Sequence, residues 1–446
     1  MISARAKKCI LGMAILVALT MSGCLNERMD ELFTLPRPSQ EYLKLQDAIE
    51  EVLDTGVVYS APAGGNNRQS VQLWDFDGDG VSEAVAFFSG PGEKPLKLYV
   101  LKKNVDEVYE PALILEGEGT GFASVDYSDL DGDGWLEIIV SRRISAELRM
   151  LRVYSVRDFE PAPIATADYT EYAVADLIGE GRSQLYILRR DPAEMTGSVE
   201  MMTFTDDGDY AGVSAPLSAG IESILRIRRG TLMQGRAALF VDAEYQSGGV
   251  VTDIFTAADG SLRNITRGAE SETSLATVRD QSIYSRDIDS DGVTEVPVTR
   301  ELEGAGDTVF RLVDWKSYDA EGNSYLKMTT YHNRTDGWYF ILPEAWAETV
   351  TVRRDDHAAG ERAVIFSVPA REDGPPVDVL AIYSITGENR EDRASKDGRT
   401  TLRTEDEVIY ACKILAGAVK LSDELEMSYV RSSFKLIYSE WSTGLT

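Results

Sequence analysis

The sequence contains few residues of the kinds on which disulfide bonds and many hydrolytic active sites depend. Only 3 of its 446 residues are cysteine and only 2 are histidine. Cys9 and Cys24 lie at an N-terminal targeting segment, so Cys412 has no partner and we expect the exported part to fold without disulfides. The chain also lacks an H-E-x-x-H zinc motif, a G-x-S-x-G nucleophile motif and a phosphate-binding loop. These absences exclude a disulfide scaffold and leave catalysis without a recognisable motif.

The two histidines, His332 and His357, add little support for an enzyme. His357 follows Asp355 and Asp356, which could orient it as a general base, but a solvated histidine in a charged loop is the favoured interpretation. Paired-carboxylate catalysis on a polysaccharide stays open as the alternative, because 74 acidic residues would hide any such pair. We therefore expect a protein that is not an enzyme.

Positive charge is also scarce. The chain has 45 lysines and arginines against 74 aspartates and glutamates, which gives a formal net charge of -29. A surface of this sign repels nucleic acid and anionic lipid headgroups, and it attracts cations. We therefore expect no nucleic-acid partner.

One long apolar run exists, and it lies at the N-terminus. Arg5, Lys7 and Lys8 precede the apolar residues 10–21, a stretch that is too short to span a bilayer stably and is typical of a secretory signal. The run ends in M-S-G-C (residues 21–24), which resembles a bacterial lipobox. The resemblance implies cleavage before Cys24 and a lipid on its thiol, hence a protein anchored to the outer face of a bacterial membrane. A plain signal peptide with an incidental cysteine is the alternative.

Acidic residues gather at one spacing in residues 129–140, D-L-D-G-D-G-W-L-E-I-I-V. Carboxylates occupy positions 1, 3, 5 and 9, and Gly134 permits a sharp turn between them. Hard oxygen ligands at these positions, with a backbone carbonyl at position 7, suit calcium. An EF-hand would place glutamate at position 12, where this chain has Val140, so the loop enters a strand instead of a helix.

Two further copies of this loop occur. Together the three copies give fifteen candidate calcium ligands, with Val81, Trp135 and Val293 contributing through backbone carbonyls: Asp75, Asp77, Asp79, Val81, Glu83, Asp129, Asp131, Asp133, Trp135, Glu137, Asp287, Asp289, Asp291, Val293 and Glu295. Because aspartate and glycine are frequent in tight turns for backbone reasons alone, an ordinary turn is the alternative interpretation. Such ions would be structural, since each loop fills its own site.

A repeat organises the chain. Weaker copies begin at Asp176 and Gly230, so the five copies start at 75, 129, 176, 230 and 287, which lie 54, 47, 54 and 57 residues apart. Short apolar runs such as 96–101, 148–156 and 199–205 follow each loop, which predicts about four strands per repeat, as in a propeller blade. The fold class is therefore mainly β: a β-propeller of five counted repeats, with up to seven possible, closed into one ring.

The loops and their lead-in residues, notably G-F-A-S-V-D-Y-S before Asp129, resemble the FG-GAP and VCBS repeats that also build integrin α-subunit propellers. The family usually has aspartate at position nine, where this chain has glutamate. The resemblance covers residues 57–330. It implies a propeller that binds calcium and a protein or glycan partner, and a structural or assembly lipoprotein is a further possibility.

The flanking segments complete the expected organisation. Residues 1–23 form the signal, and residues 24–56 form a tether and a short helix, since apolar residues recur at helical spacing over 41–55. The propeller follows over 57–330. Composition changes at Gly337, and we expect residues 337–446 to form a separate small α/β domain. The aromatic run 338–340 predicts buried strand residues, with an exposed sugar-stacking surface as the alternative.

Overall fold

The computed structural model describes residues 40–205, 208–246, 248–268, 271–302, 309–356, 358–369, 374–418 and 425–437. The predicted signal, Cys24, most of the tether and His357 lie outside these ranges. In the described part, no helix has the length and apolar character needed to cross a membrane.

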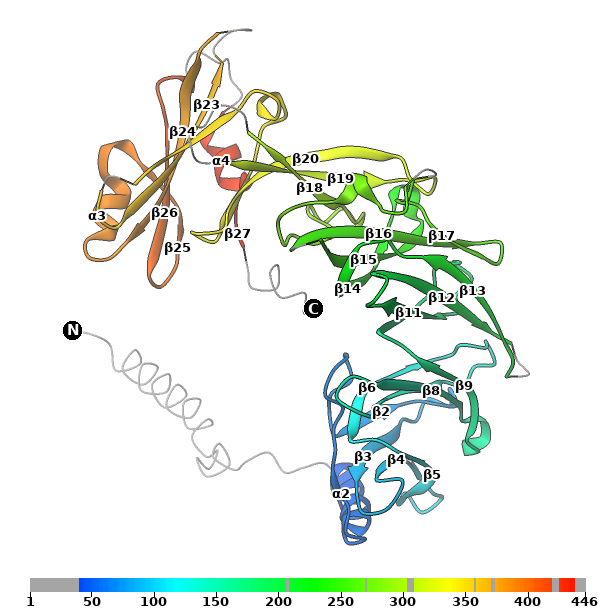
Figure 1. Ribbon diagram of the computed structural model, residues 1–446. Coiled ribbons are helices and arrows are strands. Elements are labelled where there is room, and N and C mark those ends of the chain that lie inside the picture. Colours follow the sequence, from blue (N-terminus) through cyan, green and yellow to red (C-terminus); the bar gives the residue numbers. More distant parts are fainter. Residues whose placement is uncertain are drawn as a thin grey trace, which may run out of the picture.

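The described chain is mainly β, and its strands form six antiparallel sheets of four or five strands (Figure 1). We number the sheets in chain order. Sheet 1 contains β1 (Val58–Tyr59), β2 (Val71–Trp74), β3 (Glu83–Ser89), β4 (Leu96–Lys103) and β5 (Tyr109–Gly117). Sheet 2 contains β6 (Gly121–Ser128), β7 (Glu137–Arg143), β8 (Arg149–Ser155) and β9 (Ala162–Asp168).

The next two sheets repeat this order of neighbouring strands. Sheet 3 contains β10 (Glu171–Ala175), β11 (Gln184–Asp191), β12 (Thr196–Phe204) and β13 (Tyr210–Pro216). Sheet 4 contains β14 (Ile221–Thr231), β15 (Ala237–Tyr245), β16 (Gly249–Ala258) and β17 (Ser261–Asn264). In sheets 2 to 4 every strand pairs with its neighbour in sequence, as the predicted four-strand repeat requires.

The last two sheets depart from this order, because sheet 5 takes a strand from a distant segment and sheet 6 places its last strand in sequence between the two before it. Sheet 5 contains β18 (Val296–Glu301), β19 (Arg311–Tyr318), β20 (Ser324–Asn333), β21 (Trp338–Ile341) and, from the C-terminal part, β27 (Phe434–Leu436). Sheet 6 contains β22 (Thr351–Asp355), β23 (Glu361–Pro369), β24 (Pro376–Thr386), β25 (Thr400–Thr404) and β26 (Val408–Ile414). The α-helices in the described ranges are α2 (Gln40–Leu53), α3 (Arg390–Ser395) and α4 (Met427–Ser433).

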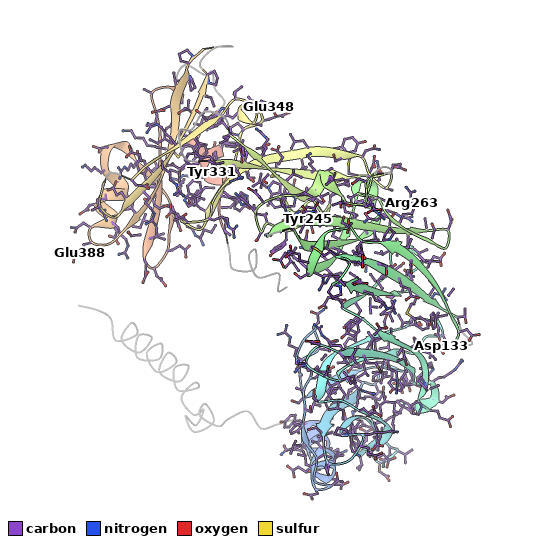
Figure 2. All side chains as sticks on the ribbon, viewed as in Figure 1. Asp133, Tyr245, Arg263, Tyr331, Glu348 and Glu388 are labelled. Carbon is purple, nitrogen blue, oxygen red and sulfur yellow. The ribbon has the colours of Figure 1, made fainter. Side chains whose placement is uncertain are left out.

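Consecutive sheets pack face to face, and this explains why their second strands are continuous apolar runs. In β7, Ile138 and Val140 pack with the side chains of sheet 1, whereas Ile139 packs with those of sheet 3. Successive side chains of a strand point to opposite faces, so a strand between two sheets is apolar on both. Side chains fill the space between successive sheets (Figure 2).

The two ends of this stack are each covered by a helix. Ala48, Ile49 and Val52 of α2 pack on the outer face of sheet 1, and Ala394 of α3 packs on the outer face of sheet 6. The stack follows an open arc with the first and sixth sheets far apart (Figure 1). The prediction of a closed ring is therefore wrong for the described chain, because helices cover the apolar faces through which the end sheets would have to meet.

The predicted domain boundary between 330 and 337 is also wrong. It falls inside the hairpin of β20 and β21, where Thr330 is paired with Ile341, and β27 then adds to the free edge of β21. One apolar cluster joins Leu312 and Tyr331 of sheet 5 to Val364 and Phe366 of sheet 6. Sheet 6 with α3 and α4 thus continues the stack.

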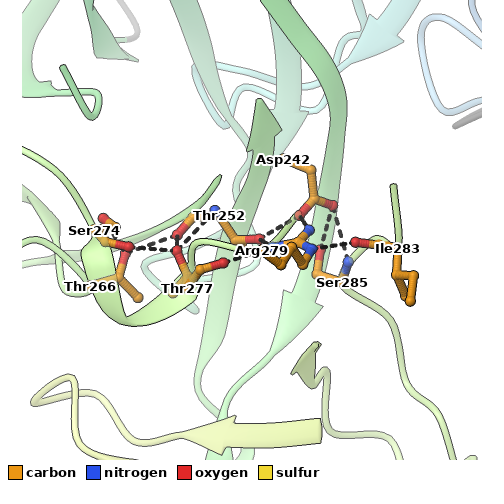
Figure 3. A network of polar contacts seen from close by, with 8 residues as sticks. All are labelled: Asp242, Thr252, Thr266, Ser274, Thr277, Arg279, Ile283 and Ser285. Atoms are coloured by element: carbon orange, nitrogen blue, oxygen red, sulfur yellow. Dashed lines mark hydrogen bonds and ion pairs between the residues drawn. The ribbon is translucent and has the colours of Figure 1, made fainter. Parts of the chain in front are cut away.

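A buried polar network connects sheet 4 with the segment that leads into sheet 5 (Figure 3). Arg279 Nη2 lies 2.9 Å from Asp242 Oδ1, and both side chains are almost fully buried. Asp242 also accepts hydrogen bonds from Thr252 and from the amide and hydroxyl of Ser285. Arg279 donates to Thr252, Thr277 and Ile283. A buried ion pair is tolerated when its remaining donors and acceptors are satisfied in this way.

Candidate metal centres

The turns that begin at 75, 129, 176 and 287 share one backbone geometry. In each turn the aspartate at position 1 accepts the amide of the glycine at position 6, for example Gly134 N to Asp129 Oδ2 at 3.1 Å and Gly181 N to Asp176 Oδ2 at 2.7 Å. Gly134 has a φ of 90°, a left-handed conformation that glycine adopts at little cost. The first aspartate and the glycine therefore build the turn whether or not a metal is bound.

The residue at position 9 fixes the other side of each turn. Glu137 Oε2 accepts the amide of Leu130 at 2.7 Å, and the neutral Gln184 accepts the amide of Leu177 at 3.2 Å in the equivalent place. One side-chain oxygen at position 9 is thus enough to accept the backbone amide at position 2. The second oxygen of a glutamate at this position is surplus to the turn, and its surroundings differ among the three acidic copies.

In the turn at 129, the surplus oxygen has no protein partner. Glu137 has no exposed surface, and its Oε1 is buried without a hydrogen bond from any described residue. Asp129, Asp131 and Glu137 bring one oxygen each within 4.8 Å of one another, and Asp131 is only 3% exposed. Burial, reinforced by the three nearby aspartates, raises the pKa of Glu137 to about 8. A cation among these oxygens would satisfy the orphaned atom and offset the repulsion.

The turn at 75 already holds a protein cation. Asp75, Asp77 and Glu83 form the equivalent group, but Lys102 Nζ lies 2.5 Å from Asp77 Oδ2 and 3.6 Å from Glu83 Oε1. Lys102 comes from β4, one residue beyond Leu101, which pairs with Ala84 next to Glu83. Its ammonium group supplies part of the positive charge that a metal ion would bring.

The turn at 287 is partly compensated in a similar way by another lysine. Lys327 Nζ of β20 lies 3.0 Å from Asp289 Oδ2 and 2.5 Å from Asp291 Oδ2. Glu295 Oε1 accepts the hydroxyl of Ser317 at 3.0 Å, so both of its oxygens have donors. The clustered acids here are Asp287, Asp289 and Asp291, without Glu295.

In each acidic loop, the backbone amide at position 7 donates a hydrogen bond to the aspartate side chain at position 5. The amides of Val81, Trp135 and Val293 donate to Oδ1 of the preceding acids at position 5 at 2.7, 2.8 and 2.8 Å. Arg157 Nη1 approaches the outer oxygen of Asp133 at 3.4 Å. Asp133 is labelled in Figure 2. Asp79 and Asp133 thus lie beside the clustered acids of their turns and mainly shape the backbone.

The weak copies form no acid cluster among the described residues. Around Asp176 the turn survives with Ile178 at position 3. At Gly230, β14 continues to Thr231, and a 3-10 turn, Met233–Gly235, leads into β15. Both segments therefore keep a turn without the clustered acids of the other three copies.

His332 and the aromatic run 338–340 belong to the core. His332 lies between the rings of Trp315 and Tyr339, and burial lowers its pKa to about 3, so it stays neutral. Trp338 and Phe340 have no exposed surface, which confirms the buried-strand interpretation over a sugar-stacking surface.

Sequence reasoning missed Lys102 and Lys327. Neither is part of an acidic loop, and each reaches its turn through strand pairing. The apolar and polar pattern along β4 predicts only that Lys102 lies on a strand. No residue near Lys102 in the sequence indicates that its side chain contacts the turn at 75.

No family model and no curated protein sequence matches this chain. Among solved structures, it is similar to a candidate 6-phosphogluconolactonase from Bacteroides fragilis NCTC 9343, at 10% sequence identity over 72% of this chain and 92% of that one, with a TM-score of 0.26. At a TM-score this low the two chains do not superpose, so the likeness assigns neither fold nor activity to this protein.

Proposed function

We propose that this protein is an exported binding protein, built from FG-GAP/VCBS-type repeats, whose acidic turns are stabilised by calcium. It holds a protein or glycan partner at the bacterial cell surface, where a lipid on Cys24 anchors it. The three acidic turns, the M-S-G-C segment and the stack of antiparallel sheets support this proposal. The β-propeller resemblance supplies the expected kind of partner.

The observation that carries the metal part is the orphaned oxygen of Glu137. An ionised carboxylate without exposed surface and with one unpaired oxygen is unfavourable unless a cation is present. Carboxylate and backbone oxygens are the ligands that calcium prefers. Asp129, Asp131 and Glu137 would hold the ion, which would neutralise them and fix the turn into β7.

The three turns are not equivalent in this proposal. Lys102 and Lys327 each bring one positive charge to the turns at 75 and 287, although Glu83 Oε1 still accepts no hydrogen bond, and a divalent ion would have to displace an ammonium group from each turn. At the turn at 129, Arg157 approaches the outer acid and Arg182 donates to the backbone carbonyl of Asp131, while Glu137 Oε1 has no hydrogen bond from a described residue. We therefore expect calcium to bind most tightly at 129.

Calorimetric titration of the metal-free protein with calcium tests the proposal. We expect one site tighter than the others, absent from Asp131→Ala and retained in Asp176→Asn, whose turn lacks the acid cluster. A glycan array and a surface pull-down, each with calcium and with chelator, test partner binding. Equal titrations of wild type and Asp131→Ala would refute the metal site, and a protein without any captured partner would refute the binding function.

A further inference from the structure

A cavity of about 640 Å³ opens where the first strands of sheets 2, 3 and 4 come together. It is lined by β6, β10 and β14 and by residues 64–68, which run along β6 through hydrogen bonds such as Asn67 Nδ2 to Val125 O at 3.1 Å. In Figure 1 these first strands lie toward the inner side of the arc, and β9, β13 and β17 lie toward its outer side. The volume of the cavity is in the range of small-molecule binding sites.

The charge of this cavity is opposite to that of the whole chain. Two acids line it, Asp126 and Glu171, against five arginines, which are Arg68, Arg149, Arg226, Arg228 and Arg229. In a chain with a net charge of -29, a lining of this sign is a local exception.

The two acids do not neutralise the arginines of β14. Glu171 pairs with Arg149 at 3.3 Å, and Asp126 accepts the hydroxyl of Tyr172 at 2.7 Å. Asp242, which attracts Arg226 through space, is already bound by Arg279. Throughout the described ranges, no side-chain hydrogen bond or ion pair involves Arg226, Arg228 or Arg229, and Asp176 attracts Arg229 only through space.

Arg226 is the clearest sign of a missing ligand. It is only 8% exposed, and its buried Nε has no partner among the described residues. A buried guanidinium N–H without an acceptor is unfavourable, and planar guanidinium groups bind carboxylate, phosphate and sulfate oxygens through paired hydrogen bonds.

We propose that this cavity binds a small, multiply charged anion through carboxylate, phosphate or sulfate groups, with the arginines of β14 as its main contacts. Tyr169 and Tyr172, which line the same cavity and pack edge to face, would give such a ligand an apolar surface as well as a hydroxyl group. The site contains none of the acids of the metal centres, so it is independent of the calcium proposal.

The test is calorimetric titration of the full chain with four probes: digalacturonate, citrate, inorganic phosphate and sulfate. Galactobiose is the neutral control, and sodium chloride of matched ionic strength is the screening control. We expect at least one anion to bind and both controls to fail. The preferred probe distinguishes a sugar acid, a simple polycarboxylate and an inorganic-type anion.

The double variant Arg228→Gln/Arg229→Gln should weaken that binding at least tenfold. Arg353→Gln, which removes a charge from sheet 6 outside the cavity, should bind as wild type does. Circular dichroism checks the fold, and if the double variant unfolds, the single variant Arg68→Gln, outside β14, replaces it with an expected loss of several fold. No binding of any anion to wild type, or equal weakening in Arg353→Gln, would overturn the proposal.

Discussion

Glu137 and Asp242 are both carboxylates with no exposed surface, and they differ in what surrounds them. Asp242 accepts hydrogen bonds from Arg279, Thr252 and Ser285, so the fold itself compensates for its burial (Figure 3). Glu137 has one backbone donor and one orphaned oxygen. Comparison of the two separates an acid that the protein satisfies from an acid whose second oxygen a cation could satisfy.

The turn of sheet 3 sharpens this contrast. Gln184 makes the backbone hydrogen bond that Glu137 makes, without a charge. At position 9 the turn therefore needs an acceptor but no carboxylate. Relative to the turn of sheet 3, which keeps Asp176 at position 1 and Glu180 at position 5, the acids at 131 and 137 are excess negative charge. Excess charge in a buried place is the physical evidence for a metal site, whereas the spacing of Asp and Gly alone is evidence only for a turn.

The largest effect is expected from Asp242→Ala. Removal of one partner leaves Arg279 buried without its counter-charge, and the free energy of unfolding should fall by about 3–5 kcal/mol. Urea denaturation measures it, with Arg353→Ala as the control for an exposed pair, which should lose about 0–1 kcal/mol. The loss should be the same with calcium and with chelator. A calcium-dependent loss would contradict the structural role of Asp242.

Removal of calcium should have the next largest effect. At free calcium one hundred times the dissociation constant, one site adds about 2.7 kcal/mol to the free energy of unfolding. Asp131→Ala should therefore lower the melting temperature in calcium and not in chelator. Asp176→Asn, in the turn of sheet 3, should leave the difference between calcium and chelator unchanged. Identical melting curves of wild type with calcium and with chelator would show that the acidic loops are ordinary turns that bind no calcium.

Glu137→Gln should make the turn of sheet 2 resemble that of sheet 3. Burial raises the pKa of Glu137 from its ordinary 4.5 to about 8 in the metal-free protein. Its contribution to stability is therefore present below pH 4.5 and is lost as the pH rises toward 8. In chelator the variant should melt above wild type at pH 8 and close to it at pH 4.5. A variant less stable than wild type at pH 8 in chelator would contradict the orphaned-oxygen argument.

The smallest effect is expected from Lys102→Gln. Loss of the ammonium group leaves Asp77 and Glu83 without their protein cation, so calcium should bind the turn at 75 more tightly and add about 1 kcal/mol at millimolar concentration. Titration should show one more tight site than in wild type. Lys97→Gln, on the same strand with an exposed partner, Glu116, is the matched control and should show no additional site.

Local patterns predicted much of the secondary structure. Apolar spacing over 41–55 corresponds to α2, Gln40–Leu53, and the apolar runs at 96–101, 148–156 and 199–205 correspond to β4, β8 and β12. The five counted repeats correspond to sheets 1 to 5. These successes share a cause, because strand alternation, helical spacing and the Asp-Gly turn depend on residues close in sequence.

The errors concern contacts between distant segments. The pairing of β21 with β20 and of β27 with β21 places residues 338–341 and 434–436 in the fifth sheet, where composition had suggested a new domain. The open arc depends on which surface covers the end sheets, and α2 and α3 cover them. Which strand pairs with which, and which helix covers an end sheet, produce no periodic pattern in the local sequence.

The sequence by itself determined the repeat, its antiparallel strands, and the acids that each turn carries, because strand alternation and turn residues are local patterns and the repeat is their recurrence along the chain. Only the tertiary structure decided which acids are compensated. Lys102 and Lys327 reach their turns from other strands, Ser317 reaches Glu295 across a strand pair, and Glu137 is left with an unpaired oxygen. It also decided that Arg226, Arg228 and Arg229 line a cavity. Charge compensation acts through space over a few ångströms, and the chain order does not give that distance.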